Sequence, residues 1–371
     1  MIRRILAMGM CMAMLLTGCG SAGEERDDGS LSVNGRSPGA ASGGAAEIND
    51  LVESAITFEK NLDDYMPKKK VYNFYLTYKI VHAWWDAVAM GIEDAADQFE
   101  HKGVIINYEY LAPDAVDADD QIKRIRDAAA TGRYDVIGVD VADSAKVAPV
   151  IDEVMAKGQK VITFSSSDTA QKENCSRIAY VGNTHNKDDG AKLAEALCEN
   201  IDYKGKVGII VGDPGAPCHE ERLEGALEVL KKYPDIELVG VDYDRESDKR
   251  AEQITDRYIG ANPDLKGMIC CNMVNPIGAV RAVKKRGLDG QVTIVGMDHD
   301  ERALRYLREG DIYCLGVQDC YSIGFDTMQV AVKVADGLLP GEMYEKLTAE
   351  KTTMIYKKDA ADMLYKLYGE E

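Results

Sequence analysis

The sequence predicts an α/β protein made of two lobes, each built on a doubly wound parallel sheet. From about Val71 to about Leu367, apolar and β-branched runs alternate with stretches of helical periodicity. Nearly every position of a run is apolar, which is typical of parallel strands that helices cover on both faces. Ten such runs are too many for one sheet of ordinary size, so we expect two sheets in two lobes.

The expected strands and helices follow one another regularly along the chain. Strands are predicted at 71–77, 104–110, 135–141, 159–164, 177–182, 206–212, 237–243, 266–272, 292–298 and 312–318. Helices are predicted at 84–99, 145–157, 188–199, 220–233, 276–286 and 323–336, and from near 119 and 300.

The first residues predict an export signal that is not part of the fold. Two arginines precede the apolar run Ile5–Leu16, which is shorter than the roughly 20 apolar residues of a membrane span. The run ends in "LTGC", which resembles the lipobox of bacterial lipoproteins. This implies that 1–18 is a signal peptide and that Cys19 carries a lipid. Residues 19–66 would be the lipid anchor and a flexible tether, which places the protein outside the cytoplasm.

Charge and cysteine content narrow the class of protein. With 44 basic and 63 acidic residues the formal charge is −19, which gives no footprint for nucleic acid or an anionic membrane surface. Seven cysteines follow Cys19, with no CxxC spacing and mostly within apolar runs. Buried thiols are therefore expected more than a disulfide framework, although the pair Cys314–Cys320 stays open.

Ligands of open α/β sheets bind beyond the carboxyl ends of the strands, so the residues at those ends are the candidate site. Here they are mostly hydroxyl, amide, carboxylate and aromatic side chains, in the stretches 78–85, 165–168, 183–186, 212–222, 242–246, 271–275, 296–301 and 316–319. Carboxylates and amides bind sugar hydroxyls well, and aromatic faces cover the apolar face of a sugar ring. Trp84 and Trp85 stand at one such corner, where we expect one or both to stack on a ligand.

From about Val71 to Tyr356 these motifs resemble the periplasmic sugar-binding proteins of the ribose-binding type, which are substrate-binding components of ABC importers. Three matches occur in order and at compatible spacing: Asn272 in "CCNMVNPIGAVRAV", Asp298 in "IVGMDHDE" and Gln318 in "LGVQDCYSIG". The resemblance implies that they are a ligand amide, a ligand carboxylate and an amide near the hinge. For a lone Asp or Asn, capping of the following helix is the competing role.

Other positions of the family pattern carry different residues. In the corner from Tyr78 to Trp85, the resemblance implies that Trp84 and Trp85 occupy the positions of the family's ring-stacking residues and that His82 occupies the position of its amide. In "VDYDRE", it implies that Tyr243 occupies the position of another stacking aromatic residue. Where the family's ribose site has an aspartate and two arginines, this chain has Ser165, Ser166 and Glu220. Serine cannot imitate the arginine fork, which argues against ribose. Another monosaccharide, a larger sugar and a cationic ligand stay open, and Glu220 is as readily a first-turn acid of a helix.

The resemblance also implies a type I periplasmic binding protein fold, with a three-segment hinge near 182–183, 318–319 and 348–351. The N-terminal lobe would hold 71–182 and 319–348, and the C-terminal lobe 183–318 and 349–358, with a helix or tail at 359–371. The implied function is to capture a sugar by hinge closure and deliver it to an ABC permease. Two alternatives are a ligand sensor that presents its closed form to a membrane histidine kinase or chemoreceptor, and a surface carbohydrate-active enzyme. We expect a monomer without a cofactor. We also expect no metal, since the five histidines show no metal-ligand spacing.

Overall fold

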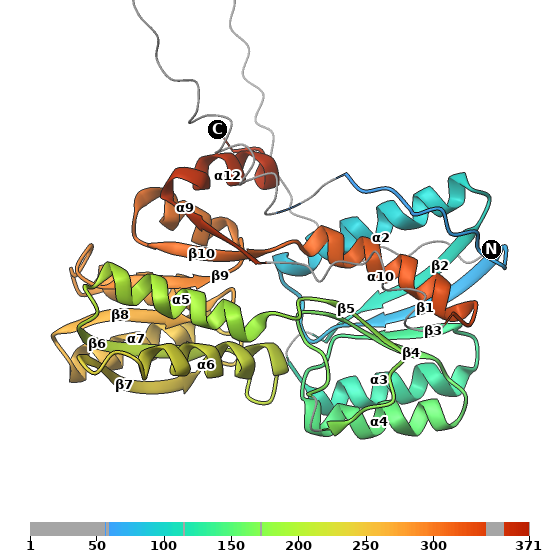
Figure 1. Ribbon diagram of the computed structural model, residues 1–371, viewed down its shortest axis with the longest axis horizontal. Helices are drawn as coiled ribbons and strands as arrows, with labels where there is room; N and C mark the ends of the chain where they lie inside the picture. The colour runs from blue at the N-terminus through green and yellow to red at the C-terminus, as the bar shows by residue number, and fades with distance from the viewer. Residues whose placement is uncertain (1–55, 57–58, 114–115, 171–172, 339–351, 371) are drawn as a thin grey trace, which may run out of the picture.

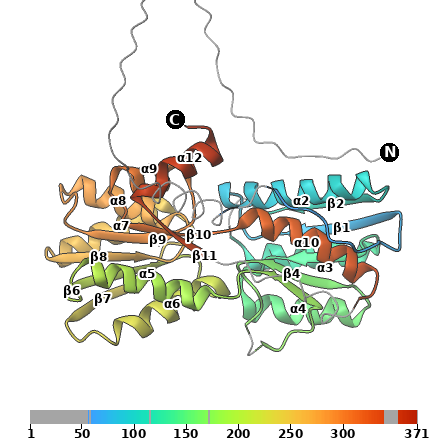
Figure 2. The same cartoon turned by 45° about the horizontal axis from the view of Figure 1, so that its top comes forward.

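The computed structural model describes residues 56, 59–113, 116–170, 173–338 and 352–370, and consists of two α/β lobes side by side (Figure 1). Each lobe has one sheet with helices on both faces, as Figure 2 also shows. The predicted two-lobed, doubly wound fold is therefore confirmed. The expected signal peptide, Cys19 and most of the tether lie outside the described residues. In the described part of the chain, no helix combines the length and apolar character needed to cross a membrane.

The N-terminal lobe contains five parallel strands in the order β2-β1-β3-β4-β5. They are β1 (Val71–Thr77), β2 (Ile105–Leu111), β3 (Val136–Val139), β4 (Val161–Ser165) and β5 (Ala179–Gly182). Its helices are α2 (Ala83–His101), α3 (Ala118–Thr131), α4 (Ser144–Ala156) and α10 (Cys320–Ala335). Helices α2 and α10 meet at Gly91 and Gly324, where an added Cβ would lie 2.0 Å from a backbone oxygen of the other helix. This contact ties α10, which comes late in the sequence, to the first helix of the lobe.

The C-terminal lobe contains six strands in the order β11-β10-β9-β8-β6-β7. They are β6 (Gly205–Val211), β7 (Ile236–Tyr243), β8 (Leu265–Cys270), β9 (Thr293–Met297), β10 (Cys314–Gln318) and β11 (Thr352–Tyr356). Its helices are α5 (Asn186–Asn200), α6 (Pro217–Leu230), α7 (Asp248–Ala261), α8 (Asn275–Lys285), α9 (Glu301–Glu309) and α12 (Ala360–Tyr368), with a 3₁₀ turn at Lys357–Asp359. The edge strand β11 runs antiparallel to β10 and was not among the predicted strands.

Two of the three expected crossovers between the lobes are described, and the third falls within 339–351, outside the described residues. The side chain of Asn183, just after β5, lies beside Gln318, the last residue of β10, and Thr352, the first residue of β11. Its Nδ2 is 3.2 Å from Gln318 Oε1 and 3.2 Å from Thr352 Oγ1, and it donates to Asp189 Oδ2 at 2.7 Å. A single buried amide network thus holds the chain segments where they pass between the lobes.

The end of the predicted tether packs against the N-terminal lobe. Lys60 forms an ion pair with the buried Asp326 at 2.5 Å, and the Asp63 amide donates to Gln329 Oε1 at 3.0 Å. Asp63 also pairs with Lys333, and Tyr65 donates to Asp336 at 2.9 Å. Residues 59–66 therefore belong to the folded lobe, since their backbone and side chains complete polar groups of α2 and α10.

All seven cysteines after residue 19 are free thiols, and six of them are buried. Cys314 and Cys320 are both fully buried and unpaired as a disulfide. The prediction of buried thiols is confirmed for six of the seven cysteines, five of which belong to the two larger hydrophobic cores.

Candidate ligand-binding site between the lobes

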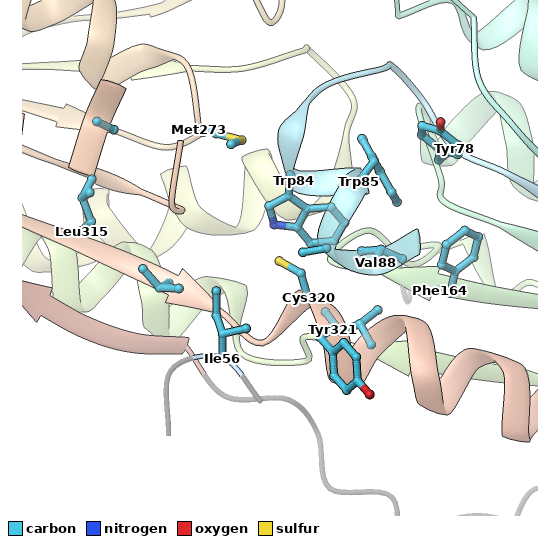
Figure 3. Close-up of a cluster of buried hydrophobic side chains, with 14 of the residues drawn as sticks. Ile56, Tyr78, Trp84, Trp85, Val88, Phe164, Met273, Leu315, Cys320 and Tyr321 are labelled. Atoms are coloured by element: carbon cyan, nitrogen blue, oxygen red, sulfur yellow. The ribbon is translucent and has the colours of Figure 1, made fainter. Parts of the chain in front are cut away.

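The carboxyl ends of strands from both lobes enclose one small cavity of about 20 Å³. Its walls are Lys79, His82, Trp84, Trp85 and Ser166 from the N-terminal lobe, and His219, Arg222, Glu246, Asn272, Met273 and Asp298 from the C-terminal lobe. Figure 3 shows Trp84 and Met273 approaching this place from the two sides. The cavity has room for about one water molecule, whereas small-molecule pockets hold roughly 300–1,000 Å³. A cavity of this size would admit a small-molecule ligand only if the lobes first moved apart.

The two indoles play different parts in the N-terminal wall. Trp85 packs against Tyr78 at 4.5 Å between ring centroids, and Lys79 Nζ lies 5.9 Å from its centroid. Trp84 stands edge-on to Trp85, with an interplanar angle of 76°. The pair therefore does not form one flat wall. Trp84 reaches the other lobe through the bond from its Nε1 to Asp298, whereas Trp85 Nε1 has no hydrogen-bond partner among the described residues.

Asp298 joins the two lobes across the cavity. Its Oδ1 accepts from Trp84 Nε1 at 3.2 Å and from Gln318 Nε2 at 2.7 Å. The side chain is 4% exposed, and burial raises the pKa of this carboxyl although Arg222 and Gln318 act in the opposite direction. Its backbone is left-handed, with φ +67°. Such strain in a non-glycine residue is typical of a functional position held by its surroundings.

Arg222 is a fully buried cation in the first turns of α6. Its guanidinium donates to the carbonyl of Cys271 at 3.1 Å and to Asn186 Oδ1 at 3.0 Å, while Nε has no partner among the described residues. A buried donor without a partner is costly, so a ligand oxygen at the cavity would satisfy it. Arg222 thus offers the fixed donor geometry of a guanidinium, which Ser166 and Glu220, at the positions of the family's two arginines, do not have.

A second cation, Lys79, lies at the β1–α2 corner beneath Trp85. It pairs with the buried Asp140 at 3.3 Å and donates to Ser167 Oγ at 3.3 Å. Burial alone would lower the pKa of Lys79, but Asp140 and other negative groups raise it, so the amine stays protonated. Ser167 in turn donates to Cys218 Sγ of the other lobe at 3.0 Å. These contacts continue the polar interface between the lobes behind the indoles.

The C-terminal wall contains Asn272, which supports both a helix and the cavity. Its Oδ1 accepts from the amides of Val274 and Asn275 at the start of α8, as the capping role predicts. Its Nδ2 donates to Glu246 Oε2 at 2.9 Å and lies 3.3 Å from Asp244 Oδ1. Asp298 does not cap α9, because Asp300 accepts from the amide of Arg302 there.

His82 caps α2, with Nδ1 accepting from the Trp84 amide at 3.3 Å. Burial and the nearby charge of Lys79 lower the pKa of His82 to about 3, so its imidazole is neutral at the cavity wall.

Six of the eleven predicted ligand residues line the cavity: His82, Trp84, Trp85, Ser166, Asn272 and Asp298. The other five lie behind or beside it. Tyr78 supports Trp85, Gln318 supports Asp298, and Ser165 bonds to Asp140 with a left-handed backbone. Glu220 and Tyr243 bond to each other at 3.1 Å away from the cavity. Glu220 therefore takes the first-turn position of α6, and Tyr243, whose hydroxyl donates to that acid, is not among the residues that line the cavity.

Five lining residues were not among the predicted ones: Lys79, His219, Arg222, Glu246 and Met273. All five lie in the stretches at strand ends that the sequence indicated as the candidate site. Their position at a strand end is therefore the feature of the sequence that could have identified them. Among the described residues, no group of three or more His, Cys, Asp or Glu side chains is arranged to hold a metal ion.

The geometry fits what comparison with known proteins finds. Residues 74–339 match the family model described as "Periplasmic binding protein domain", so the chain belongs to this family of binding proteins. It is a binding protein and not an enzyme, and its relatives are extracytoplasmic. Among curated relatives, the D-allose-binding periplasmic protein of Escherichia coli is 26% identical over 256 residues, which is 67% of this chain and 79% of that protein.

Other relatives differ in the ligand that their names state. The D-ribose/D-allose-binding protein of Pseudomonas aeruginosa is 24% identical over 61% of this chain and 71% of its own length. Among solved structures, GanP, a glucose-galactose binding protein from Geobacillus stearothermophilus, aligns with a TM-score of 0.70 and 25% identity, over 78% of this chain and 99% of GanP. The fold is therefore shared with proteins whose sugars are not the same.

Proposed function

We propose that this chain binds a neutral monosaccharide or a related polyol between its lobes and releases it to an ABC permease. The observation that carries the proposal is the cavity between the lobes, closed by the bond from Trp84 to Asp298. Its lining has two cations, Lys79 and Arg222, and two acids, Glu246 and Asp298. This balance favours an uncharged ligand rich in hydroxyls, and the names of the relatives support a sugar.

Hinge closure is the proposed mechanism of capture. In the open form the strand ends of the two lobes face water, and a sugar placed against Trp84 exposes its hydroxyls to the other lobe. Closure lets Asp298 and the free Nε of Arg222 contact the sugar, so the ligand stabilises the closed form by contacts that the open form lacks. The permease then recognises the closed form.

The direct test is a thermal-shift screen of the chain from residue 56 onward against pentoses, hexoses, polyols and small amines. A bound ligand at about 100 times its Kd adds about 2.7 kcal/mol, which raises the melting temperature of a protein of this size by roughly 5 °C. Calorimetry then gives the affinity. Tyr243→Phe is the matched control, because it removes a hydroxyl that bonds outside the cavity. A screen in which only amines bind, or nothing binds, contradicts the proposal.

We also propose that Cys19 carries the lipid that keeps the protein at the membrane. The support is the lipobox-like sequence and the extracytoplasmic family. Cys19→Ser in the full chain should move the protein from the membrane pellet to the soluble fraction.

Gene neighbourhood separates transport from sensing, since a permease and an ATPase gene beside this one support delivery, and a kinase gene supports the sensor alternative.

A further inference from the structure

The corner that follows β7 presents an acid to the cavity where an aromatic ring was expected. Tyr243, the last residue of β7, bonds to Glu220 and does not line the cavity. Three residues later, Glu246 lines it, and its side chain is only 3% exposed. An apolar ring face at this corner would accept the C–H face of a sugar, whereas a carboxylate accepts hydrogen bonds from hydroxyls.

The backbone is bent to bring Glu246 to this place. Arg245 and Glu246 both have left-handed backbones, with φ +55° and +58°. Neither is glycine, so both conformations are strained and persist only where the surrounding structure holds them. The holding contacts are visible: the Glu246 amide donates to Asp244 Oδ1 at 3.0 Å, and the Arg245 amide donates to the carbonyl of Gly212 at 3.1 Å.

The carboxylate of Glu246 is positioned by two contacts and retains acceptor capacity. Asn272 Nδ2 donates to Oε2 at 2.9 Å. His219 Nδ1 accepts from the Asp213 amide, so its Nε2 carries the hydrogen that faces Glu246 Oε1 at 3.3 Å. A carboxylate has about four acceptor positions, so roughly two remain on a buried side chain that lines the cavity.

We infer that Glu246 contacts the ligand and determines specificity, by requiring a sugar hydroxyl at the C-terminal corner of the cavity. This inference rests on the proposed function of the same site. The proposed ligands are then limited to sugars or polyols that place a hydroxyl opposite Trp84, and the deoxy analogues that lack this hydroxyl are excluded. Burial raises the pKa of the Glu246 carboxyl, and the nearby His219 and Lys79 act in the opposite direction.

A purely structural role, in which Glu246 only accepts from Asn272 and His219, makes a different prediction. Glu246→Asp separates the two roles because it keeps the charge and shortens the reach by one methylene. Glu246→Gln complements it, since it keeps the reach and one acceptor oxygen but removes the charge. The probes are sugar pairs that differ by one hydroxyl: D-ribose with 2-deoxy-D-ribose, D-galactose with D-fucose, and D-glucose with 2-deoxy-D-glucose.

The experiment measures the affinity of each sugar for the parent protein and both variants by calorimetry, after circular dichroism has shown that the variants fold. For at least one pair we expect the parent to prefer the hydroxylated sugar about tenfold or more, and Glu246→Asp to prefer it less than threefold. Glu246→Gln, which keeps an acceptor, should lie between them. If Glu246→Asp keeps the affinity and every ratio of the parent, or weakens both members of every pair equally, the inference is overturned. A parent protein that binds no sugar overturns the proposed function instead.

Discussion

Removing the carboxylate of Asp298 is the perturbation that the structure constrains best. Asp298→Ala deletes the acceptor that Trp84 Nε1 reaches from the other lobe at 3.2 Å, together with the proposed ligand contact. A hydrogen bond to a charged group contributes about 1.5–3 kcal/mol, so its loss weakens ligand binding by about 10- to 150-fold. The indole N–H left without an acceptor in the closed form adds to this loss.

Backbone strain must be separated from that effect. At φ +67° an alanine costs about 1–2 kcal/mol more than a glycine, in the open and the closed form alike. Asp298→Gly should therefore lose as much affinity as Asp298→Ala but melt at a higher temperature. Asp298→Asn keeps an oxygen acceptor and tolerates the left-handed backbone, so it should lose least.

The assay is calorimetric titration of the four proteins with the sugar that the thermal screen identifies, with melting curves recorded in parallel. The order of affinity should be parent, then Asn, then Gly and Ala together. If the alanine and glycine variants bind within threefold of the parent, Asp298 does not contact the ligand and the site is assigned wrongly.

Three further outcomes follow from the same geometry. Trp84→Phe should abolish most of the ligand-induced change in tryptophan fluorescence while Trp85→Phe keeps it, because Trp84 is the indole that bonds to Asp298 of the other lobe; the reverse result would exchange their roles. Burial and Glu246 raise the pKa of Asp244 to about 7, so its contribution to stability is complete below its unfolded pKa of about 3.9 and is lost as the pH rises through about 7. The parent should therefore melt at a higher temperature at pH 6 than at pH 8, and an equal difference in Asp244→Asn would exclude this residue as the cause. A chain beginning at residue 67 should melt several degrees below one beginning at residue 56, because the contacts of Tyr65 and its neighbours with α10 are lost. Equal melting temperatures would show that this segment does not stabilise the lobe.

Strand ends were readable from the sequence because parallel strands covered by helices are apolar throughout and stop at polar residues. That rule, with the family resemblance, pointed to Trp84, Asn272 and Asp298, which the structure places at the cavity wall. It was less informative about which side chain of a stretch turns inward. Tyr243 and Glu246 show the reason, because their directions depend on two left-handed residues and on a partner, Glu220, that is 23 positions away.

Buried charges were the other feature that sequence reasoning missed. Lys79 resembles any solvent-exposed lysine in a loop until Asp140, 61 residues later, is seen beside it. Arg222 likewise resembles a surface residue of an amphipathic helix, but it is 1% exposed and bonds to Asn186 and Cys271. In both cases the decisive partner comes from another element, so local periodicity carries no trace of it.

A crystal structure of the protein grown with the sugar from the screen tests the central claim most directly. We expect one sugar between the lobes, against the ring of Trp84, with its oxygens within hydrogen-bond distance of Asp298 and Arg222. A sugar bound elsewhere, or lobes that close without enclosing it, would show that the proposed site is wrong.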